Sequence, residues 1–275
     1  MASHMSITGG LIFVSFESEG MLRHFFADGE EILGREFTGV DRPTIVGTGL
    51  RAIAIVDSLD SLVVKVFRPG GGGPIFTVRD PEWKKIGGLA IDDDDNVYVS
   101  DIVRNFVRSF DTAGNQRFEA DIADSGFGIG HVLSPRGLHF DGEALLIAQA
   151  DPEKAQIQKV AVDQPQKGIM FSGTVPFIRS FTYEDGTQVS LVQPVDVTTD
   201  WLGYIYVLDK ELGQIFRYTA EGEPSALVNA PTAIGPDSLS AAVSIGAFEE
   251  NVYVLETGTG RIHYWYSTEQ QETEE

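Results

Sequence analysis

The feature that most constrains the fold is a pair of strand-like segments that recurs along the chain. The stretch "NVYVSDIVRNFVRSF", which begins at Asn96, contains an alternating apolar segment, an acidic residue, a short polar loop and a second alternating segment. Alternation with a period of two, rich in Val, Ile, Phe and Tyr, is typical of β-strands. The sequence therefore predicts six β-hairpins, which begin at Leu11, Ala52, Asn96, Ala144, Tyr204 and Asn251.

Further strand-like segments flank these hairpins. The segments "GGLAID", "RGLHFD", "PVDVTTD" and "AAVSIG" precede the third to sixth hairpins, and "QRFEADI" at 116–122 follows the third. Four strands in a repeat of 41 to 60 residues indicate a propeller blade. We expect an all-β, six-bladed β-propeller with four antiparallel strands per blade. Because the first copy lacks a clear leading strand and the last a clear trailing strand, we expect the termini to share a closing blade.

The third copy, "GLAIDDDDNVYVSDIVRNFVRSFDTAGN", resembles the NHL repeat. The shared pattern is a glycine, an alternating strand that ends in Asp, a turn, a segment close to "NVYVAD", a polar loop and a second strand. The match is good in the third copy, fair in the fifth and sixth, and poor in the others. The resemblance implies the propeller architecture but no single activity, because such propellers serve as scaffolds, ligand binders, lyases and hydrolases.

The composition fits one large folded domain. The chain has 275 residues, of which 42% are hydrophobic and 30 are glycine. We divide it into an expression-tag remnant, "MASHM" (1–5), a single NHL-like propeller domain (6–268) and an acidic flexible tail (269–275). The sequence does not indicate a compartment, because a native signal peptide could precede residue 6 and be removed.

The charge limits the class of partner. The formal net charge is −21, from 20 basic and 41 acidic residues, and such a surface repels nucleic acid and anionic lipid. No apolar run approaches the roughly 20 residues that span a bilayer. The absence of cysteine excludes disulfides and thiolate chemistry. We expect a soluble monomer that binds a small molecule or a protein, and neither nucleic acid nor a membrane.

Four consecutive aspartates in "LAIDDDDNVYVSD" (89–101) raise the question of a metal site. They join the first and second strands of the third blade, where Asp and Asn favour a tight, solvated turn. An EF-hand-like loop that starts at Asp92 would need Gly at position 6 and Glu at position 12, where the chain has Val97 and Val103. The sequence favours the turn and leaves weak cation binding as the alternative.

The last residues of the six second strands should form a ring at one end of the propeller. The ring comprises Phe16, Asp57, Asp101, Gln149, Asp209 and Glu256. In a structural interpretation, the carboxylates accept hydrogen bonds from backbone amides of their own loops. In a functional interpretation, they bind a cation or act as acids and bases. No cofactor is required, and the candidate ligands of Ca²⁺ or another divalent cation are Asp101, Asp209 and Glu256.

Three long links between blades, at 121–136, 175–194 and 228–240, should lie at this same end. Their arginines could pair with anionic groups, and their aromatic rings could stack on a ligand or instead cap the core. His131 is the one plausible general base. The candidate ligand-binding residues are Arg104, Phe127, His131, Arg136, Arg179, Phe181 and Tyr183.

Two functions from different classes follow from these residues. The first is a propeller that binds a ligand or protein on the face formed by the links. The alternative is a metal-dependent hydrolase, similar to lactonases, or a lyase, with its site at the axial channel mouth. Related lactonases hold calcium with Glu, Asn and Asp, whereas here Asn105 is the best-placed asparagine and no catalytic motif is present. A structural module of a larger protein is a third reading.

Overall fold

The chain forms six larger antiparallel sheets, each built from strands that follow one another in the sequence. The computed structural model describes residues 2–59, 62–165, 177–227, 239, 241–257 and 260–266. We number the sheets 1 to 6 along the chain. Within this described part, no helix is long and apolar enough to cross a membrane.

Three of the sheets have four strands. Sheet 2 comprises β4 (Pro43–Thr48), β5 (Ile53–Asp57), β6 (Val63–Phe67) and β7 (Phe76–Val78); sheet 4 comprises β13 (Pro135–Phe140), β14 (Ala144–Gln149), β15 (Gln156–Ala161) and β16 (Phe177–Ile178); sheet 5 comprises β19 (Pro194–Thr199), β20 (Ile205–Asp209), β21 (Gln214–Tyr218) and β22 (Pro224–Leu227).

The other three sheets have three strands among the described residues. Sheet 1 comprises β1 (Ala2–Thr8), β2 (Leu11–Phe16) and β3 (Met21–Phe26); sheet 3 comprises β8 (Ile86–Ile91), β9 (Val97–Asp101) and β10 (Phe106–Phe110); sheet 6 comprises β23 (Ala242–Phe248), β24 (Asn251–Glu256) and β25 (Ile262–Tyr266). Two small pairs lie in the links: β11 (Asp124–Ser125) with β12 (His131–Val132), and β17 (Ser180–Thr182) with β18 (Gln188–Ser190).

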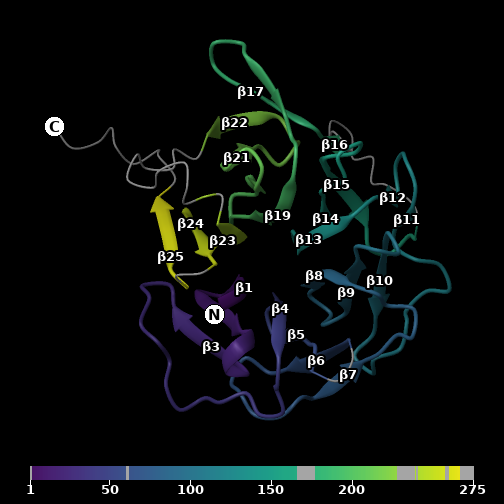
Figure 1. The fold of residues 1–275 in the computed structure, drawn as a ribbon, viewed down its shortest axis with the longest axis vertical. Helices are drawn as coiled ribbons and strands as arrows, with labels where there is room; N and C mark the ends of the chain where they lie inside the picture. Colours follow the sequence, from purple (N-terminus) through teal and green to yellow (C-terminus); the bar gives the residue numbers. More distant parts are fainter. Residues whose placement is uncertain are drawn as a thin grey trace.

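The sheets follow one another around a common centre, with their first strands on the inside (Figure 1). Each first strand contacts the first strand of the next sheet, in the order β1, β4, β8, β13, β19 and β23, and β23 contacts β1. A hydrogen bond of 2.7 Å from Ser244 Oγ to the carbonyl of Met5 joins β23 to β1. Each sheet is itself open, and none closes into a barrel.

One irregularity recurs in every sheet and shows that the six sheets repeat one unit. In each first strand, the pairing with the second strand slips by one residue just after its first pair. Such a bulge bends a strand and increases its twist. The slips lie at Ala2/His4, Pro43/Ile45, Ile86/Gly88, Pro135/Leu138, Pro194/Asp196 and Ala242/Ser244.

Glycines follow these slips where neighbouring first strands approach most closely. A Cβ atom on Gly88 would lie 2.1 Å from the carbonyl oxygen of Arg136. A Cβ atom on Gly137 would lie 2.4 Å from Oδ1 of Asp196. No other residue type fits such an approach without moving the backbone. The small residues therefore set how tightly the sheets pack around the centre.

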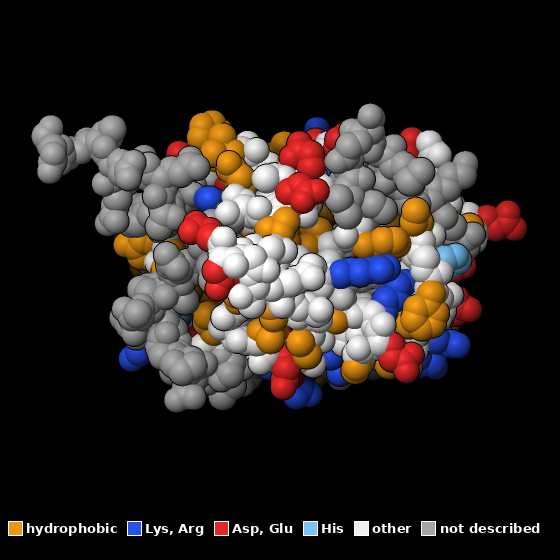
Figure 2. Space-filling model, turned by 90° about the horizontal axis from the view of Figure 1, so that it is seen from above, with side chains coloured by type: hydrophobic (Ala, Val, Ile, Leu, Met, Phe, Trp, Pro, Cys, Tyr) orange, Lys and Arg blue, Asp and Glu red, His pale blue; other side chains and the backbone are white. Residues whose placement is uncertain are grey.

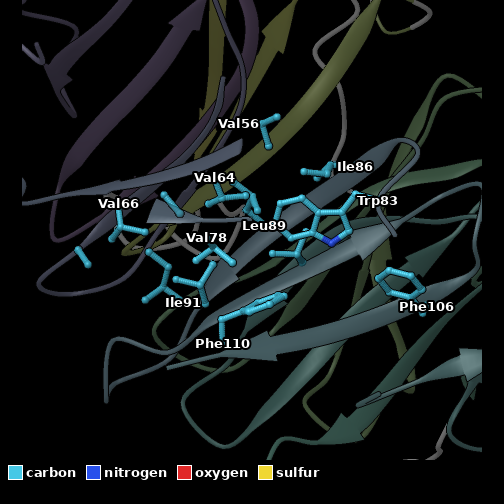
Figure 3. Close-up of a cluster of buried hydrophobic side chains, with 14 residues drawn as sticks. Val56, Val64, Val66, Val78, Trp83, Ile86, Leu89, Ile91, Phe106 and Phe110 are labelled. Carbon is cyan, nitrogen blue, oxygen red and sulfur yellow. The ribbon is translucent and has the colours of Figure 1, made fainter. Parts of the chain in front are cut away.

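The core lies between successive sheets, so both faces of each sheet are buried. In β5, Ala54 and Val56 face sheet 3, whereas Ile53 and Ile55 face sheet 1. Figure 3 shows the cluster between sheets 2 and 3, where valines from sheet 2 meet Trp83 and the aromatic rings of sheet 3. Burial on both faces explains why the second strands read as almost continuous apolar runs.

The sequence predicts the hairpins and the leading strands correctly. It is wrong about the segment 116–122, which it predicts as the fourth strand of the third repeat. In 116–122, only an isolated bridge between Phe110 and Gln116 forms, and a second bridge joins Val107 to Ala123 just beyond it. Gln116 and Ala123 oppose Phe110 and Val107, which are much closer together in the sequence, so the chain between them loops out of the ladder. Asp121, in this loop, binds Arg108 of β10, whose Nε lies 2.6 Å from its carboxylate.

The first sheet takes its leading strand from the beginning of the chain. Residues 2–5, which the sequence assigns to a tag remnant, belong to β1, and Ala2 and Met5 are buried in the core. Sheets 1 and 6 share no strand among the described residues, because β1 itself lies between β4 and β23. The tail 269–275 and the link 228–240, except Leu239, lie outside the described residues.

The aspartate run forms a turn, as the sequence favours. The carboxylate of Asp92 accepts hydrogen bonds from the backbone amide of Asn96 at 2.8 Å and from the hydroxyl of Tyr98 at 2.8 Å. Asp95 adopts a positive φ of 64° and lies 3.5 Å from the guanidinium groups of Arg51 and Arg68. Local hydrogen bonds and arginines therefore account for Asp92 and Asp95.

We expect Asp196→Asn to change how stability depends on pH. Burial, opposed by hydrogen bonds from the amide of Ile245 and the hydroxyl of Ser244, raises the pKa of Asp196 to about 7. Folding then favours the protonated form, so this carboxyl contributes its stability below its ordinary pKa and loses it as the pH rises through 7. The free energy of unfolding of the wild type should fall by roughly 3 kcal/mol relative to the variant between about pH 5 and about pH 8, by urea denaturation. Parallel pH curves would contradict this, and Asp93→Asn, in the exposed turn, is the control.

Candidate functional site

The six ring residues all stand at the last position of their second strands, as the sequence predicts. At this end, which we call the link end, the chain also enters each sheet and the second strand turns into the third. The ring residues are Phe16, Asp57, Asp101, Gln149, Asp209 and Glu256.

The ring aspartates fasten two backbone segments to each other. Oδ1 of Asp101 accepts hydrogen bonds of 2.8 Å from the amides of Val103 and Arg104, in its own loop. Oδ2 accepts hydrogen bonds of 2.5 and 3.1 Å from the amides of Lys84 and Lys85, in the incoming link. The sequence predicts the bonds within the loop but not those to the link.

The same arrangement recurs at two other sheets. Asp209 accepts hydrogen bonds from Val192 and Gln193 of the incoming link and from Leu212 of its own loop. Asp57 does the same in sheet 2 and also lies 2.6 Å from Nζ of Lys65. Burial acts to raise the pKa of Asp57, but hydrogen bonds from Lys65 and backbone amides outweigh it and leave the pKa below its ordinary value.

The candidate metal ligands do not converge on one point. Among the described residues, no three His, Asp or Glu side chains are grouped as a metal ion would require. Asp101 and Asp209 each bind their own loop and link, as above, and the carboxylate of Glu256 lies 3.4 Å from Nε2 of His263. These carboxylates thus have local structural partners at three separate sheets.

Sheet 4 differs from sheets 2, 3 and 5, because Gln149 stands in place of the aspartate. Its Oε1 accepts a hydrogen bond of 3.1 Å from the amide of Leu133. Gln156 lies directly opposite it on the next strand, and Oε1 of Gln156 accepts a hydrogen bond of 2.9 Å from Nε of Arg179. A backbone amide and a guanidinium can only donate, so both bonds fix which end of each side-chain amide is the oxygen.

Three buried donors at this place lack an acceptor within the described part of the chain. They are Nε2 of Gln149, Nε2 of Gln156 and Nε of Arg136. Residues in register on paired strands direct their side chains to the same face of the sheet, so the two amides are neighbours. Buried donors without acceptors are rare in proteins. The link end of sheet 4 is therefore rich in unused donors.

A buried lysine, which the sequence did not single out, lies beside them. Lys154 is 6% exposed, and its Nζ donates hydrogen bonds of 2.7 and 2.8 Å to the carbonyls of Gly126 and His131. Burial, reinforced by the nearby charge of Arg179, lowers the pKa of Lys154 to about 8. Lys154 thus holds down the long link between sheets 3 and 4.

Other side chains anchor the same link. Oε1 of Gln158 accepts a hydrogen bond of 2.6 Å from the amide of Gly130, and its Nε2 donates one of 2.8 Å to the carbonyl of His131. Oδ1 of Asn105 accepts a hydrogen bond of 2.8 Å from the amide of Ser134. The anchored link nevertheless presents Phe127 at 64% exposure, with Ile129 also exposed.

His131 has a carboxylate partner that the sequence analysis missed. Its Nδ1 makes a short hydrogen bond to Asp124, and both side chains are partly exposed. The parallel pairing of β11 with β12 places these two residues opposite each other. A carboxylate on Nδ1 fixes the orientation of an imidazole, as a general base requires.

The remaining candidates lie in different surroundings. Arg104 is exposed on the neighbouring sheet 3, and the guanidinium of Arg179 lies 4.8 Å from the ring of Phe177. Phe181 is 3% exposed and packs in the core between sheets 4 and 5, so it caps the core as the structural interpretation holds. Tyr183 is half-buried and donates a hydrogen bond of 3.2 Å to Gln214.

The structure thus brings Phe127, His131, Arg136 and Arg179 to the link end of sheet 4. Figure 2, a side view of the rim, shows Lys and Arg side chains gathered beside hydrophobic ones on its right half. Elsewhere in this view, Lys and Arg side chains lie singly among acidic, hydrophobic and uncharged ones.

Comparison with known proteins supports the fold. The chain is similar to a chain of the nidogen/laminin complex (TM-score 0.68, 14% identical, covering 93% of this chain and 88% of that one). It is similar to a streptogramin B lyase (TM-score 0.58, 12% identical, covering 96% of this chain and 82% of that one). It is also similar to virginiamycin B lyase from Staphylococcus aureus (TM-score 0.55, 11% identical, covering 96% of this chain and 84% of that one). No family model and no curated protein matches the sequence. These neighbours are β-propeller-like proteins, and at such low identity the likeness supports a β-propeller fold alone.

We expect Lys154→Met to loosen the link around β11 and β12 without unfolding the sheets. The change leaves the carbonyl of Gly126 without its donor and the carbonyl of His131 with Gln158 alone, and an unsatisfied buried acceptor costs about 1–3 kcal/mol. Hydrogen exchange should become faster at the amides of Gly130 and Leu133. Lys210→Met, at an exposed position, is the control. Unchanged exchange at both amides would show that Lys154 does not hold the link.

Proposed function

We propose that the chain is a closed, six-bladed, NHL-like β-propeller that binds a partner protein or ligand at the link end of sheet 4. The proposal treats 6–268 as one domain, to which residues 2–5 of β1 also belong, and the chain as a monomer. The recurring slip in all six first strands and their cyclic order of contacts support six equivalent blades. A propeller-like neighbour from a protein complex is an analogy for a binding role, and not evidence for the same partner.

One observation supports the binding role most directly: side chains of sheets 3 and 4 hold the link between these sheets in place. Lys154, Gln158, Gln149 and Asn105 all bind the backbone of the link between sheets 3 and 4. Fixing a loop in advance reduces the entropy that binding must overcome. Exposed aromatic side chains on such a platform are the usual anchors of an interface. Phe127 is the anchor we propose.

Charge favours an anionic group on the partner. Arg136, Arg179 and Lys154 are cations at this end of sheet 4, and Nε of Arg136 has no acceptor among the described residues. The amide nitrogens of Gln149 and Gln156 lie in side chains that are 0% and 1% exposed, so a partner meets the arginines and not these amides. A carboxylate or similar oxyanion can accept two hydrogen bonds from one guanidinium. We therefore propose a partner that presents an acidic group next to an apolar one.

We expect Phe127→Ser to remove most of the binding. A library of random peptides displayed on phage would be selected on the wild-type protein, and the selected peptides then measured on variants. Loss of a central aromatic anchor should weaken binding by about tenfold or more. Leu50→Ser is the matched control, because Leu50 is 69% exposed but lies in the turn at the opposite end of sheet 2. Peptides that bind both variants as tightly as the wild type would refute the proposed site.

A second candidate function is acid–base catalysis of hydrolysis or elimination. The contact between His131 and Asp124 favours it, with His131 as the base and Asp124 as the residue that positions it. Two of the fold neighbours are lyases. The metal-dependent form is not favoured, because Asp101, Asp209 and Glu256 have local partners instead of a common centre.

Hydrolysis of 4-nitrophenyl acetate tests this alternative. If His131 is the base, His131→Gln should lower the rate by about 100-fold, and Asp124→Asn should also lower it, because the imidazole loses the carboxylate that orients it. His263→Gln is the matched control, since His263 also contacts a carboxylate but in sheet 6. Equal rates for the wild type and His131→Gln would exclude this role.

A further inference from the structure

The outer edge of sheet 1 is only half covered by the chain itself. Sheets 2, 4 and 5 have a fourth strand, whereas β3 is bridged on its outer side at a single pair, Phe25 and Glu31. Beyond this bridge, the chain leaves β3 and pairs with the loop of sheet 2, where the amide of Thr38 donates to the carbonyl of Gly72 at 2.9 Å. The half of β3 near Met21 thus has no neighbouring strand among the described residues.

The pairing pattern identifies the backbone groups that remain free along this edge. On the outer side, the amide of Phe26 donates to the carbonyl of Glu30, and the carbonyl of His24 accepts from the amide of Ile32, both at 2.9 Å. Alternate residues of an antiparallel strand direct their backbone groups to the same side. The amide and carbonyl of Leu22 and the amide of His24 therefore face outward, with no backbone partner in the described residues.

A cavity of about 370 Å³ lies along this open part of β3. One wall is formed by residues 20–24 and the other by residues 31–37. Its volume falls within the range of small-molecule and peptide pockets, roughly 300–1,000 Å³. Leu33 lines it and is 81% exposed, and Met21 beside it is also exposed. The cavity thus offers apolar contacts next to unpaired backbone groups.

The charged side chains of the cavity differ in how far they are neutralised. Arg23 lies 2.7 Å from the carboxylate of Glu19 and 3.9 Å from that of Glu31. Arg35 and Glu36 also line the cavity, and neither forms an ion pair with any residue that the structure describes. A guanidinium without a counter-ion favours an acidic group on whatever occupies the cavity.

We propose that this edge binds an extended peptide segment of a partner protein, which adds to sheet 1 in the position of the missing strand and places an acidic side chain against Arg35. The open backbone groups of Leu22 and His24 provide the hydrogen bonds of strand addition. Met21 and Leu33 contact the alternate apolar side chains of the peptide. This site lies on a different sheet from the proposed site of sheet 4 and does not depend on it.

Hydrogen exchange on the full chain tests the proposal at single amides. The probe is a capped hexapeptide, acetyl-Val-Asp-Val-Thr-Val-Thr-amide, added to about 1 mM, a concentration that detects even weak binding. We expect the amides of Leu22 and His24 to exchange at least about tenfold more slowly with the peptide, because they become hydrogen-bonded. The amides of Arg23 and Phe25, which already pair with β2, should not change.

Two matched controls separate strand addition from other binding. The same peptide with N-methyl groups on alternate amides cannot pair with an edge and should give no protection. Arg35→Glu should weaken the binding of the unmodified peptide by about tenfold, whereas Lys210→Glu, the same charge change at an exposed site of sheet 5, should not.

Three results would overturn the proposal. The first is no protection of Leu22 and His24 at the highest peptide concentration. The second is equal protection by the N-methylated peptide. The third is slow exchange of both amides in the free protein, which would mean that the edge is already occupied. If this protection of Leu22 and His24 grows with protein concentration, the occupant is a second copy of the chain.

Discussion

The hydrogen bonds between a carboxylate at the end of a second strand and the link that precedes its sheet are the interaction on which the link end depends. Asp101 shows it most fully, because its two oxygens bind four backbone amides from two segments. Backbone amides in links have no strand partner, and burying them without an acceptor would be costly. The carboxylates therefore fix where the links enter sheets 2, 3 and 5. At sheet 4, where Gln149 replaces the aspartate, the side-chain amide nitrogens of Gln149 and Gln156 have no acceptor among the described residues. Lys154 donates hydrogen bonds to the link there.

Much of the fold could be predicted from the sequence because its information is local. Alternating apolar residues and a polar loop indicate the hairpin of β9 and β10, and the same pattern indicates the other five hairpins. The fourth strands are less predictable, since they pair along one edge only. The segment 116–122 reads as a strand, but the chain loops out of the ladder there, because Gln116 and Ala123 oppose Phe110 and Val107, which are much closer together in the sequence.

The site could be predicted only in part. Comparing the repeats with one another shows that Gln149 stands where four of the other five copies have a carboxylate, and such a departure from the internal rule was a usable signal. Lys154 and Asp124 carried no such signal, because their partners are determined by how the link folds back onto sheet 4. Phe181 could not be told from an exposed aromatic, since its burial depends on packing between two sheets.

The contact between β1 and β23 has a consequence for the order of folding. Within each sheet, strands that pair are neighbours in the sequence, so their hairpins can form on fast timescales. The bond from Ser244 to Met5 spans 239 residues, and the entropy of closing a loop rises with its length. We therefore expect the six sheets to assemble progressively and the two ends of the chain to meet in the final, slowest step. Until then the facing sides of sheets 1 and 6, whose apolar side chains pack together in the folded chain, would be exposed to other chains.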